Sequence, residues 1–212
     1  MLVPASEGYR IWAPTYDDGP NPLVAIESRV LGRFLWDLRG KRVLDVACGT
    51  GRWARHARTR GATVLAVDRC REMLDRCHAP AALADAQAIP APAEWADVTI
   101  CALALGYLES PMREFVRVTR RGGSIFVSDV HPKALDRKWT HSFRNGAEVY
   151  QIEHRRYSLR ALLQTDGLRL IGYAEARFAA PELEIFRRAG KESSFQEMRE
   201  VPAVYAAHWI KL

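Results

Sequence analysis

Residues 41–51, with the sequence KRVLDVACGTG, constrain the fold of this chain more than any other stretch. A short β-rich apolar run surrounds one acid, Asp45, and ends at Gly49 and Gly51, after which a helical pattern begins at Arg52. A strand that passes through a glycine turn into a helix presents free backbone N–H groups and lets a ligand approach the backbone closely. A buried carboxylate in such a strand needs a partner, and a cationic amino group would serve. The stretch predicts the first strand and helix of an α/β domain, with a ligand at the turn.

The turn fits more than one kind of site. Residues 49–54 also match the dinucleotide fingerprint, with Ala54 as the third small residue, whereas an ordinary strand–helix turn needs no ligand. The next apolar run, residues 62–68, ends in a second acid, Asp68. Its separation from Gly51 is close to the ~20 residues expected for a carboxylate that accepts both ribose hydroxyls. The two strands together favour a nucleotide-containing ligand.

Strands and helices alternate along most of the chain. Apolar periodicity predicts further helices at residues 24–38, 52–60, 69–78, 111–118 and 157–164, and further strands at residues 83–85, 97–105, 124–129, 168–178 and 203–210. Strands separated by helices indicate right-handed βαβ crossovers and a parallel sheet. Residues 181–200 are charged and irregular, and we interpret them as a hairpin excursion between the last two strands.

Four segments are expected within one domain. Residues 1–22 combine Pro, Gly and Asp with aromatics, which predicts loops and turns, without a strand, that close over the ligand as a lid. Residues 23–130 form the cofactor-binding core, residues 131–157 lose their periodicity and cover the substrate, and residues 158–212 form a C-terminal helix and strands. A chain of 212 residues is long enough to bury about 70% of its unfolded surface in a single domain.

Composition argues against several classes of protein. The first residues lack a basic segment followed by an apolar one, and no apolar run approaches the roughly 20 residues of a membrane helix, so we expect a cytoplasmic protein without a membrane span. The four cysteines form no CxxC pair, and we expect reduced thiols and no metal site. The net charge of +6 comes from scattered arginines, which disfavours a nucleic-acid partner. We expect a monomer or a homodimer.

Taken in order, these motifs resemble those of class I S-adenosylmethionine-dependent methyltransferases of the small, single-domain kind. Residues 45–51, DVACGTG, are similar to the family's first motif, with Ala47 where a glycine is frequent. Asp68 matches the acid that holds the ribose, and residues 69–74, RCREML, resemble the segment whose first residue and methionine flank the adenine. Residues 84–86, ADA, look like the motif at the adenine edge.

The resemblance implies a fold, a cofactor and a set of binding residues. The fold is a doubly wound, mostly parallel seven-stranded sheet with an antiparallel C-terminal strand pair, the Rossmann-like methyltransferase fold. The cofactor is S-adenosyl-L-methionine, which leaves as S-adenosyl-L-homocysteine. The residues expected to bind it are Tyr16, Asp45, Ala47, Gly49, Gly51, Asp68, Arg69, Met73, Asp85, Ala86 and Ala102. The three acids would each meet one polar region of the cofactor: the ammonium group, the ribose diol and the aminopurine.

The expected reaction is in-line transfer of the methyl group from the sulfonium to an oxygen, nitrogen or carbon atom of a small molecule. Charge dissipates in the transition state, so the protein mainly holds the reacting atoms in line. Two alternatives remain open. One is a non-catalytic, or an RNA- or protein-directed, S-adenosylmethionine-binding protein of the same fold. The other is an NAD-dependent oxidoreductase, which would need a second cofactor half-site.

One histidine falls at the start of the expected substrate cover. His131 follows the fifth predicted strand, and Pro132 restricts its backbone to an extended conformation. An imidazole with a pKa of about 6.5 is a suitable base at neutral pH, so His131 is the predicted catalytic base for a hydroxyl or amine acceptor. The alternative is a histidine that bonds only to Asp129 or to a loop carbonyl, and His141 and His154 compete for the catalytic role.

Overall fold

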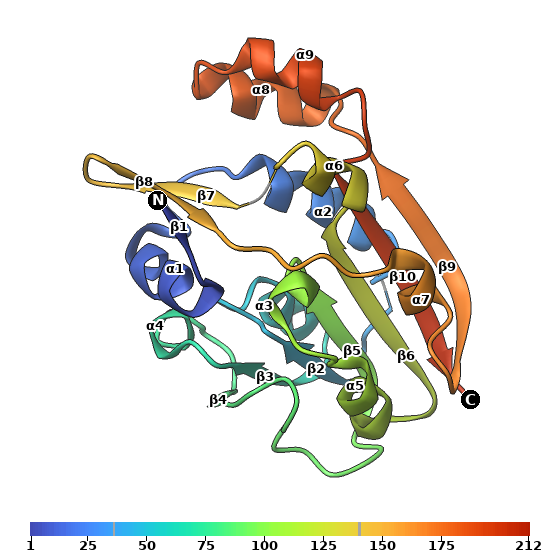
Figure 1. Ribbon diagram of the computed structural model, residues 1–212. Coiled ribbons are helices and arrows are strands. Elements are labelled where there is room, and N and C mark those ends of the chain that lie inside the picture. The colour runs from blue at the N-terminus through green and yellow to red at the C-terminus, as the bar shows by residue number, and fades with distance from the viewer. Residues whose placement is uncertain (36, 140) are drawn as a thin grey trace.

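The protein is built around a seven-stranded sheet, seen in a computed structural model that describes residues 1–35, 37–139 and 141–212. Its strands are β2 (Arg42–Val46), β3 (Thr63–Asp68), β4 (Ala81–Leu83), β5 (Ala96–Ala102), β6 (Thr119–Val130), β9 (Leu168–Ala176) and β10 (Val204–Lys211). They lie in the order β4-β3-β2-β5-β6-β10-β9, with β10 antiparallel to both of its neighbours and the other neighbouring pairs parallel. The predicted fold class is confirmed (Figure 1).

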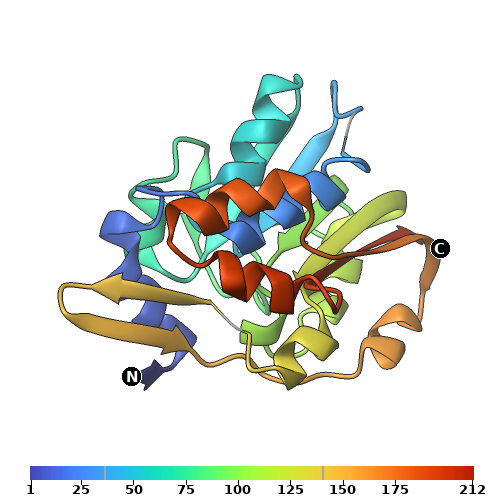
Figure 2. The same cartoon turned by 90° about the horizontal axis from the view of Figure 1, so that it is seen from above.

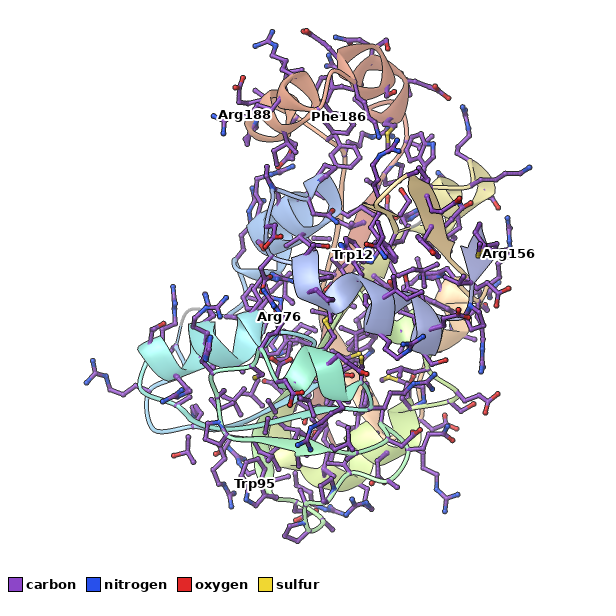
Figure 3. All side chains as sticks on the ribbon, turned by 90° about the vertical axis from the view of Figure 1, so that its left-hand side faces the viewer. Trp12, Arg76, Trp95, Arg156, Phe186 and Arg188 are labelled. Carbon is purple, nitrogen blue, oxygen red and sulfur yellow. The ribbon has the colours of Figure 1, made fainter. Side chains whose placement is uncertain are left out.

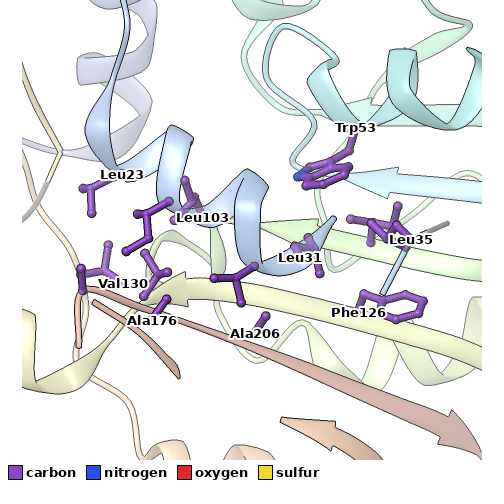
Figure 4. Packing of buried hydrophobic residues seen from close by; sticks show 14 of the residues in the cluster. Leu23, Leu31, Leu35, Trp53, Leu103, Phe126, Val130, Ala176 and Ala206 are labelled. Atoms are coloured by element: carbon purple, nitrogen blue, oxygen red, sulfur yellow. The ribbon is translucent and has the colours of Figure 1, made fainter. Parts of the chain in front are cut away.

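Both faces of the sheet are buried. In β2, Leu44 and Val46 pack into one apolar core and Val43 packs into the other, as the two-residue period of a strand requires. The helices that cover the Val43 face are α2 (Pro22–Leu31) and α3 (Arg52–Thr59), and α8 (Ala180–Arg188) packs against α2. The helices on the opposite face are α5 (Met112–Val118) and α7 (Leu159–Leu163). Figure 4 shows the first core, in which Leu31 of α2 lies between Trp53 and the strands.

A buried carboxylate fixes α2 against α3 and the sheet. Glu27 is fully buried, and its Oε2 accepts a hydrogen bond from Nη2 of Arg52 at 2.6 Å. Its Oε1 accepts from Nε1 of Trp53 at 3.2 Å and from the hydroxyl of Ser128 at 2.7 Å. A buried charge is tolerated when it is paired and hydrogen-bonded in this way. Glu27 of α2 therefore fixes the start of α3, which follows the glycine turn after β2, to both α2 and strand β6.

Several predicted helices are shorter than expected. The helix expected at residues 24–38 ends at Leu31, and Leu35 and Leu38 are buried in the irregular chain that follows. Residue 36 of that expected helix lies outside the described residues. The helix expected at residues 69–78 is reduced to α4 (Arg71–Leu74). Apolar side chains in buried turns repeat at intervals that resemble those of a helix, so periodicity alone overestimated these lengths.

The N-terminal segment corrects the expectation of loops without a strand. It contains β1 (Leu2–Val3), α1 (Ala5–Trp12) and the 3-10 turn η1 (Ala13–Thr15). Gly8 and Trp12 lie four residues apart, and both are buried on the inner face of α1. Two apolar contacts one turn apart are a weak pattern in a segment rich in Pro and Gly, so the sequence did not reveal this helix.

The stretch expected to be aperiodic, residues 131–157, also has structure. It contains α6 (Pro132–Asp136) and the hairpin of β7 (Ser142–Asn145) and β8 (Glu148–Ile152). β8 pairs in parallel with β1, which gives a second, three-stranded sheet in the order β1-β8-β7. This sheet lies beside α1 (Figures 1 and 2). We call α1, η1 and the three-stranded sheet the roof.

Residues 181–200 are helical, and the expected hairpin excursion was wrong. They form most of α8 and α9 (Glu192–Met198), which pack against each other through Phe186 and Phe195, with ring centroids 5.5 Å apart. Glu182 is buried in an ion pair with Arg29 of α2, and it also accepts a hydrogen bond from the N–H of Ala179 at 2.9 Å. Figure 3 shows this helical pair at one end of the molecule, with Arg188 pointing outward and Trp95 at the opposite end.

Candidate functional site

A cavity of about 310 Å³ lies at the carboxyl ends of β2, β3 and β5, below the roof. Open α/β sheets bind ligands at this edge. Eight of the predicted cofactor-binding residues line the cavity: Tyr16, Asp45, Ala47, Gly49, Asp68, Arg69, Met73 and Ala102. We call the turns that follow β2, β3 and β5 the floor of the cavity. The roof contributes Ala5, Ser6 and Tyr9 to the lining.

The turn after β2 has the backbone geometry of a close ligand approach. Ala47 has φ +52° and Gly49 has φ +55°, a region that residues with a side chain seldom adopt. This conformation explains why glycine suits position 47 well. The N–H of Gly49 donates to Oδ2 of Asp68 at 2.8 Å, and the N–H of Gly51 donates to the carbonyl of Cys48 at 2.9 Å. The turn is therefore anchored to the end of the neighbouring strand, β3.

Asp45 is a buried carboxylate on the cavity wall. Asp45 is 2% exposed. Its Oδ2 accepts a hydrogen bond at 2.7 Å from the N–H of Ala54, which lies in the first turn of α3. Burial raises the pKa of Asp45 to about 7, because the charged form loses its hydration. A cationic ligand in the cavity would restore the ionised form. Asp45 is therefore suited to an ammonium group.

Asp68 organises the turn after β3. Its Oδ1 accepts from the N–H of Cys70 at 2.8 Å, while Oδ2 holds Gly49 as described above. Burial raises the pKa of Asp68, and the main-chain N–H groups of Cys70, Gly49 and Arg69 oppose that shift. A carboxylate has about four lone-pair sites, so these bonds leave acceptor capacity for a ligand. Arg69 and Met73 line the cavity next to it.

Three predicted cofactor-binding residues do not line the cavity. Asp85 is exposed and its Oδ1 accepts from the N–H of Gln87 at 2.8 Å, whereas Ala86 is buried in the core. Gly51 begins α3 with φ +78°, and a side chain at this position would overlap the thiol of Cys77. Gly51 thus has a packing reason of its own to be glycine.

The roof side of the cavity is aromatic. Tyr9 and Tyr107 line it, with ring centroids 5.5 Å apart in an edge-to-face arrangement. The hydroxyl of Tyr9 lies 3.0 Å from Nδ1 of His141, a histidine that is 1% exposed. Burial lowers the pKa of His141 to about 4, so its imidazole is neutral at pH 7. Behind them Trp12 stacks on Phe143 with centroids 4.8 Å apart.

His131 does not line the cavity. It is the N-cap of α6: its Nδ1 accepts from the N–H of Lys133 at 3.1 Å. Its Nε2 lies 3.2 Å from Oε1 of Glu175, to which it donates in the neutral tautomer. Burial lowers the pKa of His131. Both ring nitrogens are thus engaged within the fold, and the geometry gives a catalytic role for His131 no support.

A buried contact between an imidazole and a carboxylate joins the core sheet to the segment that follows β8 of the roof. Nε2 of His154, which follows β8, lies 3.2 Å from Oδ1 of Asp129 in β6, and both side chains are fully buried. Oδ2 of Asp129 accepts from the N–H of Gly106 at 2.8 Å and from the hydroxyl of Tyr157 at 2.9 Å. The imidazole packs so closely on Gly106 that a side chain there would overlap it. We call Asp129 and His154 the seam.

Sequence reasoning missed several residues that shape the site. Asn21 lines the cavity, and its Oδ1 caps α2 by accepting from the N–H of Leu23 at 2.9 Å. Asn followed by Pro22 at the first helical position is a recognisable start signal for a helix. Glu27 stands on the otherwise apolar face of α2, which is a signal of a buried ion pair. Tyr107 follows β5 in a 3-10 turn, and no local pattern marks it as a wall residue.

Comparisons with known proteins agree with this geometry. Residues 44–127 match the family model of the methyltransferase domain. The malonyl-[acyl-carrier protein] O-methyltransferase of Serratia marcescens is 35% identical over 104 residues, which cover 45% of this chain and 41% of that protein. The bifunctional biotin-biosynthesis protein BioHC of Cellvibrio japonicus is 28% identical over 176 residues, which cover 77% of this chain and 35% of that protein. The matches therefore span well under half of these relatives' own lengths.

A solved structure shows the same fold. The S-adenosylmethionine-dependent methyltransferase of Mesorhizobium loti superimposes with a TM-score of 0.68 at 21% sequence identity, covering 90% of this chain and all of that one. The chain therefore has the Rossmann-like fold of the class I S-adenosylmethionine-dependent methyltransferases, and residues 44–127 within it match the methyltransferase domain. None of the helices in the described ranges is long and apolar enough to cross a membrane.

Proposed function

We propose that this protein transfers the methyl group of S-adenosylmethionine to a small-molecule acceptor that enters beneath the roof. The observation that carries the proposal is the meeting of two buried carboxylates, Asp45 and Asp68, with a positive-φ turn in one cavity. S-adenosylmethionine presents an ammonium group and a ribose diol, and these are the groups that two such carboxylates bind. A nucleotide without a cation would leave Asp45 without a partner.

The cofactor would lie along the floor. We assign the ammonium group to Asp45, the ribose hydroxyls to Asp68, and the two faces of the adenine to Arg69 and Met73. The methionine part would run past Ala102 toward the roof. Asp85 stays our prediction for the adenine edge. The residue before it, Ala84, donates its N–H to the carbonyl of Asp68 at 2.9 Å. The turn that carries Asp85 therefore begins beside the proposed ribose site.

The methyl group would face Tyr9 of the roof and Tyr16, which follows η1. Burial keeps the pKa of Tyr9 well above its ordinary value and raises that of Tyr16 to about 12, so both hydroxyls remain protonated donors. His141, behind Tyr9, is neutral. These groups orient an acceptor but are poor bases. We therefore favour an oxygen acceptor that arrives ionised, and a carboxylate is the simplest.

A carboxylate acceptor also agrees with one relative, whose name states that it methylates a malonyl group on an acyl-carrier protein. The tyrosines are our basis for a carboxylate acceptor. They give no basis for inferring that the acceptor is attached to a carrier protein. The protein's contribution to the rate would be to align the acceptor oxygen, the methyl group and the sulfur, and alignment of this kind contributes about 7–11 kcal/mol in favourable cases.

Calorimetry with S-adenosylmethionine and with NAD tests the cofactor assignment directly. We expect saturable binding of S-adenosylmethionine, competition by S-adenosylhomocysteine, and no binding of NAD. A protein that binds NAD and ignores S-adenosylmethionine contradicts the proposal. Transfer of a labelled methyl group to a matched panel of carboxylic acids, phenols and amines then tests the acceptor, and we expect label in the carboxylic acids.

A further inference from the structure

Two cysteine thiols meet behind the cofactor turn. Cys48 belongs to the turn after β2 and lines the cavity, whereas Cys77 lies in the turn after α4, where its N–H donates to the carbonyl of Leu74 at 2.8 Å. Both cysteines are free and half-buried, and both meet Gly51, whose N–H donates to the carbonyl of Cys48 at 2.9 Å. The sulfur of Cys77 also lies directly against Gly51, where a side chain would overlap it.

The two thiols differ in chemistry. The hydrogen bond from Cys48 lowers the pKa of Cys77 to about 6; burial opposes this shift, and the N–H of Ala79 and the nearby charges of His78 and Arg55 reinforce it. The same contact and burial raise the pKa of Cys48. At neutral pH Cys77 is therefore largely a thiolate, whereas Cys48 keeps its proton, which its Sγ donates to the carbonyl of Gly49 at 3.6 Å. An accessible thiolate beside a second thiol is the arrangement that oxidants attack selectively.

The remaining cysteines lack this arrangement. Cys70 and Cys101 are buried, and burial raises the pKa of each thiol. Protonated, buried thiols react slowly with oxidants. The contrast makes Gly51 the one place among the described residues where two free cysteines meet outside the fully buried core.

We propose that Cys48 and Cys77 form a peroxide-sensitive dithiol, and that its oxidation to a disulfide distorts the cofactor turn and weakens cofactor binding. The formation of the disulfide rests on the meeting of the two cysteines at Gly51 and on their unequal acidity, and not on what the cavity binds. Its effect on affinity rests on the proposed function, because it concerns S-adenosylmethionine. The proposal makes the glycine turn a redox-responsive element as well as a ligand site.

The oxidation balances with hydrogen peroxide as the oxidant. The Cys77 thiolate attacks one peroxide oxygen, the O–O bond breaks, and hydroxide leaves as Cys77 becomes a sulfenic acid. The Cys48 sulfur then attacks the Cys77 sulfur, the S–O bond breaks, and the S–S bond forms. The protons of the two thiols end in water. In sum, two thiols and one hydrogen peroxide give one disulfide and two water molecules, and two electrons pass from sulfur to oxygen.

The disulfide must change the turn because of its bond length. Two bonded sulfur atoms lie about 2.05 Å apart, much closer than two thiols in a hydrogen bond. Cys48 is held by its N–H to the carbonyl of Val67 at 3.1 Å, and the next N–H, of Gly49, is held by Asp68 at 2.8 Å. Formation of the disulfide would therefore displace Cys48 and the backbone of the turn that faces the cofactor. The hydrogen bond from the N–H of Gly49 to Asp68 would weaken as a result.

Peptide mapping tests the disulfide independently of function. The full-length protein is treated with hydrogen peroxide, blocked with an alkylating reagent and digested with trypsin without reduction. We expect a cross-link between the peptides of residues 43–52 and 77–113. The cross-link should be absent from the Cys77→Ser variant and retained in the Cys70→Ser variant. Because Cys101 lies in the second peptide, fragmentation must place the link at Cys77. Its absence from the peroxide-treated wild type overturns the proposal.

Calorimetry on the same samples tests the consequence. We expect the oxidised wild type to bind S-adenosylmethionine about tenfold more weakly than the reduced protein, with recovery after dithiothreitol. Peroxide should leave the affinity of Cys77→Ser unchanged. A mapped disulfide with unaltered affinity overturns the effect on the turn. Reduced protein that binds no S-adenosylmethionine contradicts the proposed function instead, and the peptide map still decides the fate of the dithiol.

Discussion

The floor and the roof of the cavity are built in different ways. The floor consists of main-chain N–H groups and carboxylates at the ends of three adjacent parallel strands, and its contacts, such as that of Gly49 with Asp68, join residues close in the sequence. The roof consists of aromatic side chains from segments far apart, such as Trp12 and Phe143. The floor is rigid because the sheet holds it. The roof depends on packing between separate pieces, so we expect it to be the part that responds to ligands.

Removal of the Asp68 carboxylate should give the largest effect, because it breaks the floor itself. Asp68→Ala loses the predicted bonds to the ribose, each worth about 1.5–3 kcal/mol for a charged acceptor, so we expect the affinity for S-adenosylmethionine to fall about 100-fold. It also leaves the N–H groups of Gly49 and Cys70 without their acceptor, so the melting temperature should fall as well.

A surface carboxylate provides the matched control. Asp75 pairs with Arg71 on the outside of α4, and its side chain is 62% exposed. Asp75→Ala should therefore keep both the affinity and the melting temperature of the wild type, as exposed ion pairs contribute little. Calorimetry and thermal unfolding on the two variants give the comparison. An Asp68→Ala protein with the dissociation constant of the wild type would remove Asp68 from the cofactor site.

The same contrast explains what the sequence could reveal. Asp45, Gly49 and Asp68 lie within 24 residues in adjacent strands, and their roles follow from strand ends, turn residues and spacing that are local in the chain. The roof depends on pairings such as that of Leu2 with Gln151, which no local pattern encodes. The sequence therefore predicted the sheet and the floor and missed α1, the hairpin and the second sheet.

The catalytic prediction shows the same limit. His131 is the predicted base because it directly follows a strand at the expected substrate edge. In the fold its Nδ1 accepts from Lys133 in the turn of α6 and its Nε2 meets Glu175, a residue 44 positions away. The histidine that stands behind a cavity residue is His141, which directly precedes β7 of the roof. Side-chain direction after a strand depends on tertiary contacts, and these are absent from the local sequence.

Hydrogen exchange should reveal a smaller but regional effect on the roof. Residues 9–22 were predicted to close over the cofactor as a lid, and Tyr9 and Tyr16 do line the cavity. We expect S-adenosylmethionine to slow amide exchange in residues 5–16 about tenfold, because bound ligand suppresses local opening. The amides of α8 and α9, remote from the cavity lining, should keep their rates. Equal amide exchange rates in residues 5–16 with and without cofactor would contradict the lid and show that the roof is a fixed wall of the cavity.

The contact between Asp129 and His154, the seam, should give the smallest effect, a change in the free energy of unfolding with pH. The direction of that change follows from the pKa shift of His154. Burial alone would lower the pKa of His154, but the charge and hydrogen bond of Asp129, together with the carbonyl of Arg155, outweigh it, and the pKa of His154 is raised. A raised pKa means that the folded state binds this proton more tightly than the unfolded state, whose histidine has a pKa of about 6.5. The stabilisation is therefore complete below about pH 6.5 and is lost as the pH rises through the folded pKa.

The measurement is the free energy of unfolding in urea at pH 6 and at pH 8.5, for the wild type and for His154→Gln. Asp45 and Cys77 also have shifted pKa values in or near this range, but they are present in both proteins and cancel in the difference. We expect the advantage of the wild type over His154→Gln to shrink by about 1 kcal/mol between the two pH values, since each unit of pKa shift corresponds to about 1.4 kcal/mol. An advantage that is constant or grows with pH would show that His154 is neutral in the fold, and the link between roof and core would then be a hydrogen bond without a charge on the imidazole.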